Sequence, residues 1–386
     1  MRRVGIGLAL AAALAALSLW TVRASFGDPV RWTPDALFYQ ARLLEIRGAE
    51  HDAAFSQAFR GPLSERLRRH DPTRTGNPAW VAYNERFYER RQAVPLAGAA
   101  LYPAAGDRSL LYVSLAGYVA AILALFGLLA LRFRLAIAAA ATLAAVFLPA
   151  LSFHSAYPLT DSWGLALQTA ALAAALLTLD RGPRWLVLWV AAVILLSFTR
   201  DSTWVPVLGA AWVAYRTRTR LAAALFGTGV IAALPAFFLY SVPLRELLAF
   251  AVNGLQPPPE TSWSFIAEKY PAALLELVRS NGGLVRDGEW YTGAYLAGGI
   301  LLLFLLARRG PRDDVAPALM KAATVVSLGY VLAVPSFSAF RIELIFVPMA
   351  AFGLAALAER LVVKGELLER LRLPAPLPGR SSQGSS

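Results

Sequence analysis

An aspartate stands at the start of a predicted helix, directly after the first apolar stretch of the chain. In "TPDALFYQARLLEIRG", Thr33 can cap a helix and Pro34 suits its first position. Asp35 follows, and Tyr39 and Arg42 lie one and two turns later on the same face. A carboxylate in the first turn is favoured by the helix dipole by about 0.3–1 kcal/mol. It could also act as a general base that takes a proton from a hydroxyl group.

Further ionisable residues stand where other apolar stretches begin or end. They are His154, Asp161, Arg200, Asp201, Arg341 and Glu343. If these stretches cross a membrane, such side chains are costly and need partners, and carboxylates can pair with arginines. A guanidinium makes paired hydrogen bonds to phosphate oxygens, so arginines beside a general base could bind a phosphate.

Most of these residues also have a purely structural interpretation. Asp161 could cap a helix, and His154 could be an interfacial histidine. Arg200 and Asp201 could form an ion pair with each other. Arg341 could extend to lipid headgroups. The residues alone do not choose between the two interpretations.

The composition predicts that membrane helices position these residues. The 386 residues are 57% hydrophobic, with a mean hydropathy of +0.52. Apolar runs of about 17–25 residues can cross a bilayer as helices, and no alternating pattern of barrel strands occurs. The fold class is therefore an all-α membrane protein, with about ten expected spans at 4–22, 109–131, 134–153, 162–179, 185–199, 202–215, 221–240, 291–307, 315–335 and 342–358.

Two of these expectations have alternatives. The first apolar stretch could be a cleaved secretory signal peptide, because it follows "MRR" and ends in small residues near Ala24. The pair 185–199 and 202–215 is short and is interrupted by "TRD". It could form a hairpin that does not quite reach the far surface, which would leave the orientation of later helices unchanged.

The positions of the basic residues predict the orientation. With the N-terminus inside, the inner segments hold 17 basic residues, whereas the short outer loops hold only Arg200 and Arg341. The protein is therefore expected in the cell (inner) membrane with both termini in the cytoplasm. The net charge of +12 is then mostly explained by the basic residues of the inner segments, and no nucleic-acid partner is expected.

This topology places all the substantial loops on the outer face. Residues 1–358 are expected to form one membrane domain with outer loops at 23–108 and 241–290, followed by a cytoplasmic tail, 359–386, whose end is disordered. Amphipathic loop helices are expected at 34–47, 52–60, 62–70, 79–92, 244–254 and 263–279. The candidate residues named above all fall on the outer face, and this common location favours the chemical interpretation.

Several familiar chemistries lack their motifs. The chain has no cysteine, which excludes disulfides and thiolate metal sites. It contains no GxxxxGK phosphate loop, no GxSxG and no HExxH. A divalent metal is possible, but nothing in the sequence requires one.

Several stretches resemble the GT-C superfamily of integral-membrane glycosyltransferases. "PDALFYQARLLEIRG" is similar to the first outer loop of that superfamily, where an aspartate stands on a juxtamembrane helix after the first span. "ERRQAVPLAGAALYP" (89–103) resembles the approach to the second span. "FLPALSFHSAYPLTDSWGLALQTAALAAALL" (147–177), "LLSFTRDSTWVPVL" (195–208) and "FRIELIFVPMAAFGLAAL" (340–357) resemble later spans. Many members carry paired acids in the first loop, whereas Asp35 has no adjacent acidic partner.

The resemblance implies a sugar transfer from a polyprenyl-phosphate donor to a glycan or lipid acceptor on the outer face. Asp35 would be the base, and Arg341 and Arg200 would bind the leaving phosphate. Asp161 would orient the acceptor or an arginine. The other candidate substrate-binding residues are Asp201, His154, Tyr39, Arg42 and Glu343. A single displacement with one base would invert the anomeric centre, whereas a double displacement needs a second carboxylate close by.

Two other classes of protein remain possible from the sequence. A lipid or solute transporter would also be polytopic, although such proteins commonly show inverted repeats and broken helices, and neither is visible here. A non-catalytic membrane protein of envelope assembly is the third possibility. The large loops on one side favour chemistry at the outer face.

Overall fold

Seven helices in the described residues are long and apolar enough to cross a membrane. The computed structural model describes residues 2–240, 242–306, 315–335 and 340–372. The seven spans involve α1 (Arg2–Thr21), α8 (Ser109–Ala130), α11 (Asp161–Arg181), α14 (Arg220–Leu239), α17 (Trp290–Leu306), α18 (Val315–Ala333) and α19 (Val347–Arg372). Every regular element in this part of the chain is a helix, which confirms the predicted all-α class.

The span expected at 134–153 is broken into two helices. α9 (Leu135–Val146) and α10 (Pro149–Ser155) meet at a bend of 65°, and they make an eighth candidate span only if counted together. Pro149 explains the break, because proline lacks a backbone donor and disfavours helical geometry in the preceding Leu148. The bend directs the residues after α10 toward the start of α11.

The pair expected at 185–199 and 202–215 forms two short helices. α12 (Leu186–Ser197) has 12 residues and α13 (Trp204–Thr217) has 14, which is less than a bilayer crossing normally needs. By length and composition the described residues therefore support seven or eight spans rather than the ten expected.

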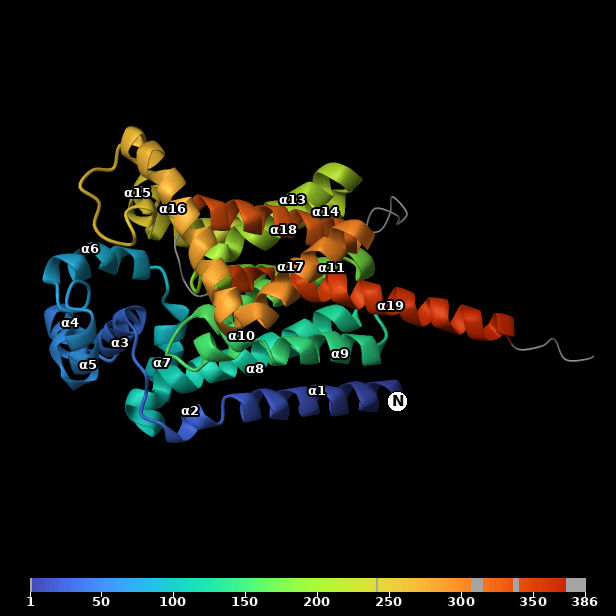
Figure 1. Cartoon of the computed structure of the whole chain (residues 1–386), viewed down its shortest axis with the longest axis horizontal. Helices are drawn as coiled ribbons and strands as arrows, with labels where there is room; N and C mark the ends of the chain where they lie inside the picture. The colour runs from blue at the N-terminus through green and yellow to red at the C-terminus, as the bar shows by residue number, and fades with distance from the viewer. Residues whose placement is uncertain (1, 241, 307–314, 336–339, 373–386) are drawn as a thin grey trace, which may run out of the picture.

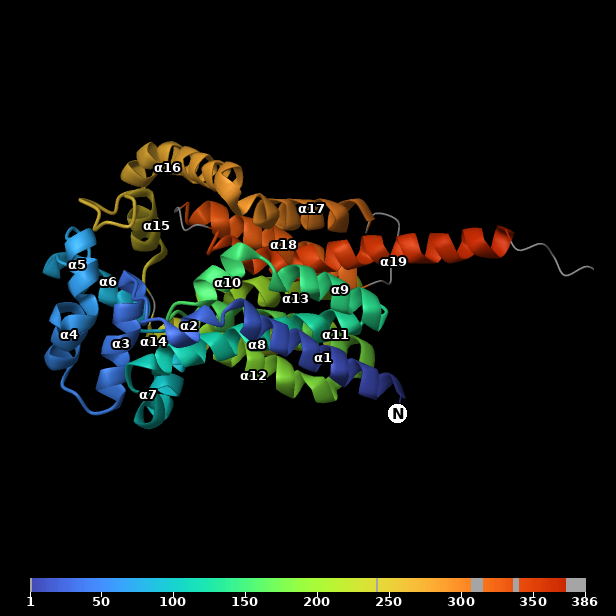
Figure 2. The ribbon, with the colours of Figure 1, turned by 60° about the horizontal axis from the view of Figure 1, so that its bottom comes forward.

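The loop helices gather at one end of the bundle. Figures 1 and 2 show the long helices running along the long axis of the molecule, with the N-terminus at the opposite end from the loop helices. The loop helices are α3 (Pro34–Ile46), α4 (His51–Arg60), α5 (Glu65–His70), α6 (Pro78–Tyr88), α15 (Leu244–Val252) and α16 (Trp263–Leu284). Both expected outer loops therefore meet at the same end.

Three boundaries differ from the expected ones. The helix expected at 79–92 ends at Tyr88, and a separate helix, α7 (Ala93–Ala105), leads into α8. The helix expected at 263–279 continues to Leu284 and then through a π-helical segment that ends before α17. Gly288 in that segment has φ +135°, a conformation that glycine adopts more easily than other residues. α19 extends beyond 358 to Arg372, and the end expected to be disordered lies outside the described residues.

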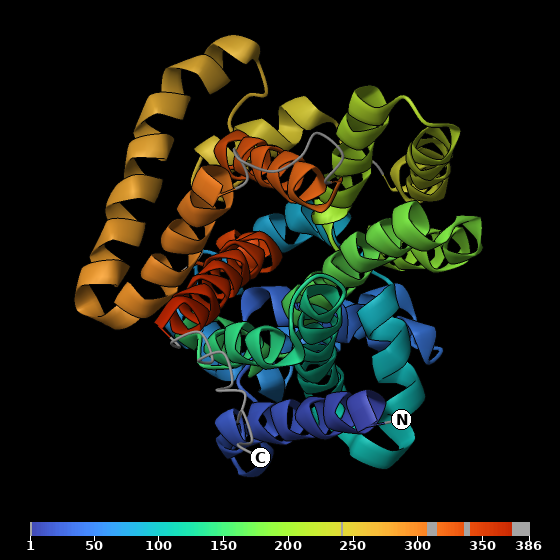
Figure 3. The same cartoon turned by 90° about the vertical axis from the view of Figure 1, so that its right-hand side faces the viewer.

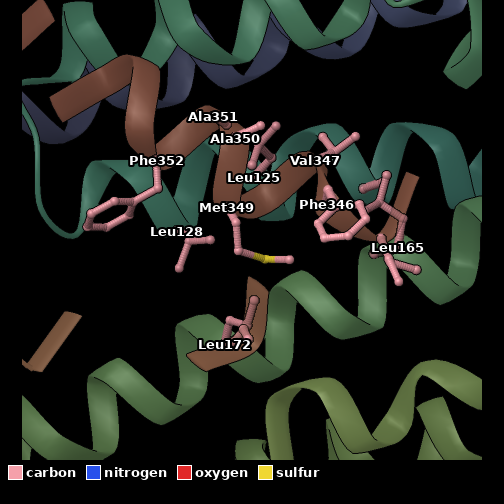
Figure 4. Packing of buried hydrophobic residues seen from close by; sticks show 14 of the residues in the cluster. Leu125, Leu128, Leu165, Leu172, Phe346, Val347, Met349, Ala350, Ala351 and Phe352 are labelled. Carbon is pink, nitrogen blue, oxygen red and sulfur yellow. The ribbon is translucent and has the colours of Figure 1, made fainter. Parts of the chain in front are cut away.

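Buried apolar side chains fix α8, α11 and α19 relative to one another. Met349 of α19 lies between Leu128 of α8 and Leu172 of α11, and all three are fully buried (Figure 4). α19 also contacts α17 closely, because a Cβ on Gly353 would lie 2.0 Å from the Gly299 carbonyl oxygen. An end-on view shows α11 and α19 inside the bundle and α1 and α16 at its periphery (Figure 3). This packing sets where the first residue of α11 and the residues before α19 can meet.

Candidate functional site

One arginine joins two carboxylates that are far apart in the sequence. Arg341 donates from Nη1 to Asp35 Oδ2, and from Nε to Asp161 Oδ1 at 2.9 Å. Asp35 lies in the first turn of α3, Asp161 begins α11, and Arg341 comes shortly before α19. The core packing of α11 against α19 brings two of these three residues together, and α3 supplies the third at the loop end.

Asp35 is not the cap of its own helix. Thr33 fills that role, because its hydroxyl accepts from the Ala36 amide at 3.2 Å. Asp35 Oδ1 instead accepts a hydrogen bond from the Tyr88 hydroxyl at 2.6 Å. The Asp35 side chain remains 22% exposed, so a substrate hydroxyl could reach it. Dipole stabilisation alone therefore does not account for its contacts.

The surroundings keep Asp35 ionised. Burial alone would raise the pKa of Asp35, but the charge of Arg341 and hydrogen bonds from Tyr88 and Arg341 together bring it below its ordinary value. Burial and the neighbouring Asp35 raise the pKa of Tyr88 well above its ordinary value. Tyr88 is therefore a neutral donor and Asp35 a charged acceptor at neutral pH.

Asp161 differs from Asp35 in both exposure and partners. Its side chain is only 3% exposed, and Arg200 Nη2 lies 3.0 Å from the same Oδ1 that binds Arg341. Buried His154 is near enough to interact with Asp161 electrostatically. Asp161 thus holds two arginines in place, and a substrate cannot reach it as readily as Asp35.

A glycine on α11 makes room for the second of these arginines. A Cβ on Gly164 would lie 2.4 Å from Cγ of Arg200 and 3.2 Å from its Cβ. The Arg200 side chain therefore crosses α11 at a position where any side chain would displace it. This close approach allows Arg200 to reach Asp161, one turn earlier on the same helix.

A second group of polar contacts adjoins the first. Arg91 donates from Nη1 to the Tyr39 hydroxyl at 3.0 Å and from Nη2 to Asp201 Oδ2 at 2.9 Å. Arg90 also pairs with Asp201. The Tyr39 hydroxyl lies 3.2 Å from Thr160 Oγ1, next to Asp161 in sequence. Tyr39, one turn after Asp35, therefore connects the two groups.

The combined cluster carries more positive than negative charge. Its charged members are the guanidiniums of Arg90, Arg91, Arg200 and Arg341 and the carboxylates of Asp35, Asp161 and Asp201, which leaves an excess of one positive charge. Burial and the neighbouring charge of Arg91 lower the pKa of Arg90 to about 10. Such a cluster favours a bound anion.

Two donors in the cluster have no partner among the described residues. They are Nη2 of Arg341 and Nε of Arg91, and both are buried. Buried donors in proteins are normally hydrogen-bonded. Each arginine thus keeps a hydrogen bond that an anion could accept.

The structure separates two of the predicted site residues from this cluster. Arg42 points to the Glu45 and Glu85 carboxylates, at 2.7 and 2.8 Å, although it shares a helix face with Asp35. Glu343 is buried and accepts from Asn281 Nδ2 of α16 at 2.7 Å. The other predicted residues lie in or beside the cluster: Asp35, Asp161, Arg341, Arg200, Asp201, His154 and Tyr39.

Four residues of the cluster were not predicted as site residues. They are Tyr88, Arg90, Arg91 and Thr160. The run "ERR" before an apolar stretch is a visible sequence feature, but nothing in it distinguishes these arginines from the many others. Tyr88 and Thr160 have no distinguishing feature in the sequence.

The described residues contain no group of three or more His, Cys, Asp or Glu side chains that could hold a metal ion. Asp35 and Asp161 share an arginine instead.

No protein-family model matches this chain, and no curated protein matches it.

Proposed function

We propose that this protein is an integral-membrane glycosyltransferase that moves a sugar from a polyprenyl-phosphate donor to a glycan or lipid acceptor. The observation that carries the proposal is the partly exposed, ionised Asp35 beside a buried cluster with excess arginine, at the loop end of a membrane bundle. A base and an anion site side by side suit a reaction in which a hydroxyl loses a proton and a phosphate leaves.

Asp35 serves as the general base in this reaction. The acceptor hydroxyl gives its proton to the Asp35 carboxylate while its oxygen forms a bond to the anomeric carbon. The bond between that carbon and the phosphate oxygen breaks, and its electron pair leaves with the polyprenyl phosphate. Reaction requires the acceptor oxygen to lie within about 3 Å of the carboxylate.

Arg341 links the base to the leaving group. Its free Nη2 donates to a phosphate oxygen while its other nitrogens hold Asp35 and Asp161. An anion on Arg341 offsets the charge that lowers the pKa of Asp35. Donor binding therefore makes Asp35 a stronger base when it is needed. Arg200 supports this geometry through Asp161.

The transfer inverts the anomeric centre. A double displacement needs a second carboxylate that can attack the sugar. The nearby Asp161 is 3% exposed and is held by two arginines, so it positions them rather than attacking. Only Asp35 combines exposure with a negative charge in this pair. No step requires a divalent metal.

The same proposal includes membership of the GT-C superfamily and a location in the inner membrane, with both termini in the cytoplasm. α9 and α10 together make one crossing, and the short helices α12 and α13 make one crossing each, giving about ten crossings. The loop helices then face outward. The 17 basic residues of the inner segments support this orientation.

Mass spectrometry of lipid-linked sugars in a deletion strain tests the proposal. The strain should accumulate one polyprenyl-phosphate sugar and lose that sugar from one envelope glycan or lipid. Unchanged lipid-linked sugars, together with lipid or solute movement in proteoliposomes without a covalent product, would support a transporter instead. Loss of function only on large deletions, and never on substitution of Asp35, would indicate a non-catalytic assembly protein.

A further inference from the structure

Glu343 is a buried carboxyl group that the arginine cluster does not use. It begins the 3₁₀-helical segment Glu343–Phe346, which leads into α19, and it is 8% exposed. Arg341, two residues earlier, donates to other carboxylates. Within the described residues, no cation pairs with Glu343. A carboxylate that is buried without a cation is costly, and such a group commonly takes up a proton instead.

Asn281 of α16 provides a polar partner for this group. Its Nδ2 donates to Oε1 of Glu343 at 2.7 Å. The other two polar atoms of the pair, Glu343 Oε2 and Asn281 Oδ1, are buried and have no partner in the described part of the chain. Both can only accept while Glu343 is ionised, so neither can satisfy the other. Because buried polar atoms are normally hydrogen-bonded, the ionised pair lacks one donor.

One proton on Glu343 supplies the missing donor. A neutral carboxylic acid has an O–H donor, and an amide has both an N–H donor and a carbonyl acceptor. Two such planar groups can exchange a pair of hydrogen bonds side by side. With the proton on Oε2, Glu343 donates to Asn281 Oδ1 while its Oε1 accepts from Nδ2, so all four atoms have partners. The same proton removes the buried charge.

The chain around Glu343 also carries Arg341 and is held by two other elements. Gln168 of α11 is fully buried, and its Nε2 donates to the Ile345 carbonyl oxygen at 2.8 Å. Asn281 lies near the C-terminal end of α16, a helix of the second loop. Side-chain hydrogen bonds thus attach this short segment to α11 and to α16. Both attachments limit the movement of the backbone from which the Arg341 side chain extends.

We propose that Glu343 is held as a neutral carboxylic acid paired with Asn281, and that this pair positions Arg341. The proposal accounts for an ionisable residue at the start of a candidate span that has no ionic partner among the described residues. The protonation of Glu343 is independent of the reaction that the protein performs. The effect of the pair on sugar transfer rests on the proposed function.

Infrared difference spectroscopy tests the protonation without an assay of transfer. A protonated carboxyl group has a C=O stretching band that an ionised carboxylate lacks. The purified full-length protein at neutral pH should show this band, and Glu343→Gln should lose the contribution of Glu343. Glu268→Gln is the control, because Glu268 of α16 is 72% exposed and pairs with Lys269. It should lose carboxylate bands only. An unchanged protonated-carboxyl band in Glu343→Gln would overturn the proposal.

Asn281→Leu tests the pairing. Leucine neither donates nor accepts, so the proton of Glu343 loses its acceptor. The protonated-carboxyl band should remain and move to a higher frequency, because a hydrogen bond to the acid weakens its C=O bond. Ser280→Ala is the control, because Ser280 is the preceding residue of α16 and donates to Glu276 instead. The band should not move in this control. An unmoved band in Asn281→Leu would overturn the acid–amide pair.

Two substitutions of Glu343 test whether the pair positions Arg341. Glu343→Leu removes both hydrogen bonds and should lower kcat about tenfold, because small displacements of a positioned group are costly in rate. Glutamine can exchange both hydrogen bonds with Asn281, so Glu343→Gln should recover most of this loss. Equal losses in both variants, or no loss in either, would overturn the positioning role. The Glu343 band in a wild-type protein that transfers no sugar would contradict only the proposed function.

Discussion

Asp35 and Arg341 form an ion pair, and in the proposed reaction this pair takes part in both the proton transfer and the binding of a phosphate. Tyr88 adds a hydrogen bond that holds the carboxylate in its charged form. The pair is partly exposed, at 22% for Asp35 and 18% for Arg341, so water or a substrate can reach it. The resting site is therefore charged and oriented, and its basicity depends on what binds Arg341.

Tyr88→Phe should shift the pH dependence of transfer. The Tyr88 hydrogen bond lowers the pKa of Asp35, so its loss raises that pKa. A base with a higher pKa is protonated at a higher pH, and the acidic limb of the kcat/KM profile should therefore move upward. Tyr102→Phe is the control, because Tyr102 also donates to a loop aspartate, Asp107. Its acidic limb should match that of the wild type, and an unshifted limb in Tyr88→Phe would contradict Asp35 as the titrating base.

Arg341→Lys should lose most of the transfer activity at normal protein level. A guanidinium holds Asp35 and Asp161 and keeps a free donor, whereas one ammonium cannot reproduce this fork. The measurement is the transfer rate of purified variant and wild type. Near-normal turnover with lysine would instead indicate that Arg341 only extends to lipid headgroups.

The sequence could predict which residues belong to the candidate site better than which of them bind one another. Asp35, Asp161 and Arg341 stand out because charges beside apolar stretches need partners. Arg200 and Asp201 are adjacent in sequence, yet they bind partners in other elements. Arg42 shares a helix face with Asp35 but binds Glu45 and Glu85. Tertiary packing decides which charged side chains form pairs, and the spacing of residues along one helix does not reveal that packing.

At the scale of elements, most helix positions could be predicted because long apolar runs leave few alternatives. The expected α3 and α8 agree with the structure within a residue. The bend at Pro149 and the separate α7 were harder to predict. An apolar run has the same hydrophobicity whether its helix is straight or broken. The bend at Pro149 affects the candidate site, because α10 is followed by the segment that leads to Asp161, the first residue of α11.

Gly164→Ala should impair both stability and activity. Its Cβ would collide with the stem of Arg200, and overpacking of this kind typically costs about 1–3 kcal/mol. The displaced Arg200 would no longer fix Asp161, so transfer should fall about tenfold. Gly127→Ala on α8 is the control, because no atom lies within 4 Å of a Cβ there. The measurements are thermal unfolding and the transfer rate. An active, stable Gly164→Ala would show that the Arg200–Asp161 contact is dispensable.

At the scale of the whole molecule, the clustering of both loops at one end gives a direct prediction of topology. The chain has no cysteine, so single-cysteine variants report one position each. Lys269→Cys on exposed α16 should react with a membrane-impermeant thiol reagent in intact cells. Arg181→Cys, at the far end of α11, should react only after permeabilisation. The reverse pattern would place the candidate site in the cytoplasm.

The arrangement of the whole molecule also explains why the contacts of the candidate site could not be predicted from the sequence. The proposed base, Asp35, comes from the first loop, the carboxylate of Asp161 from the start of α11, and Arg341 from the approach to the last span. Core packing of Met349 against α8 and α11 fixes part of this geometry. The sequence predicts that these residues share one face, but only packing places them within hydrogen-bond distance.

The central claim is that Asp35 takes a proton during sugar transfer, and Asp35→Asn tests it most directly. Asparagine keeps the size of the side chain but cannot accept the proton. Transfer from a polyprenyl-phosphate sugar by the purified variant should fall by about 10²–10⁴-fold, the usual contribution of general base catalysis. Thermal stability, measured beside it, should show that the variant is folded. A folded Asp35→Asn that transfers sugar at the wild-type rate would contradict the account and leave Asp35 as a structural residue at the start of α3.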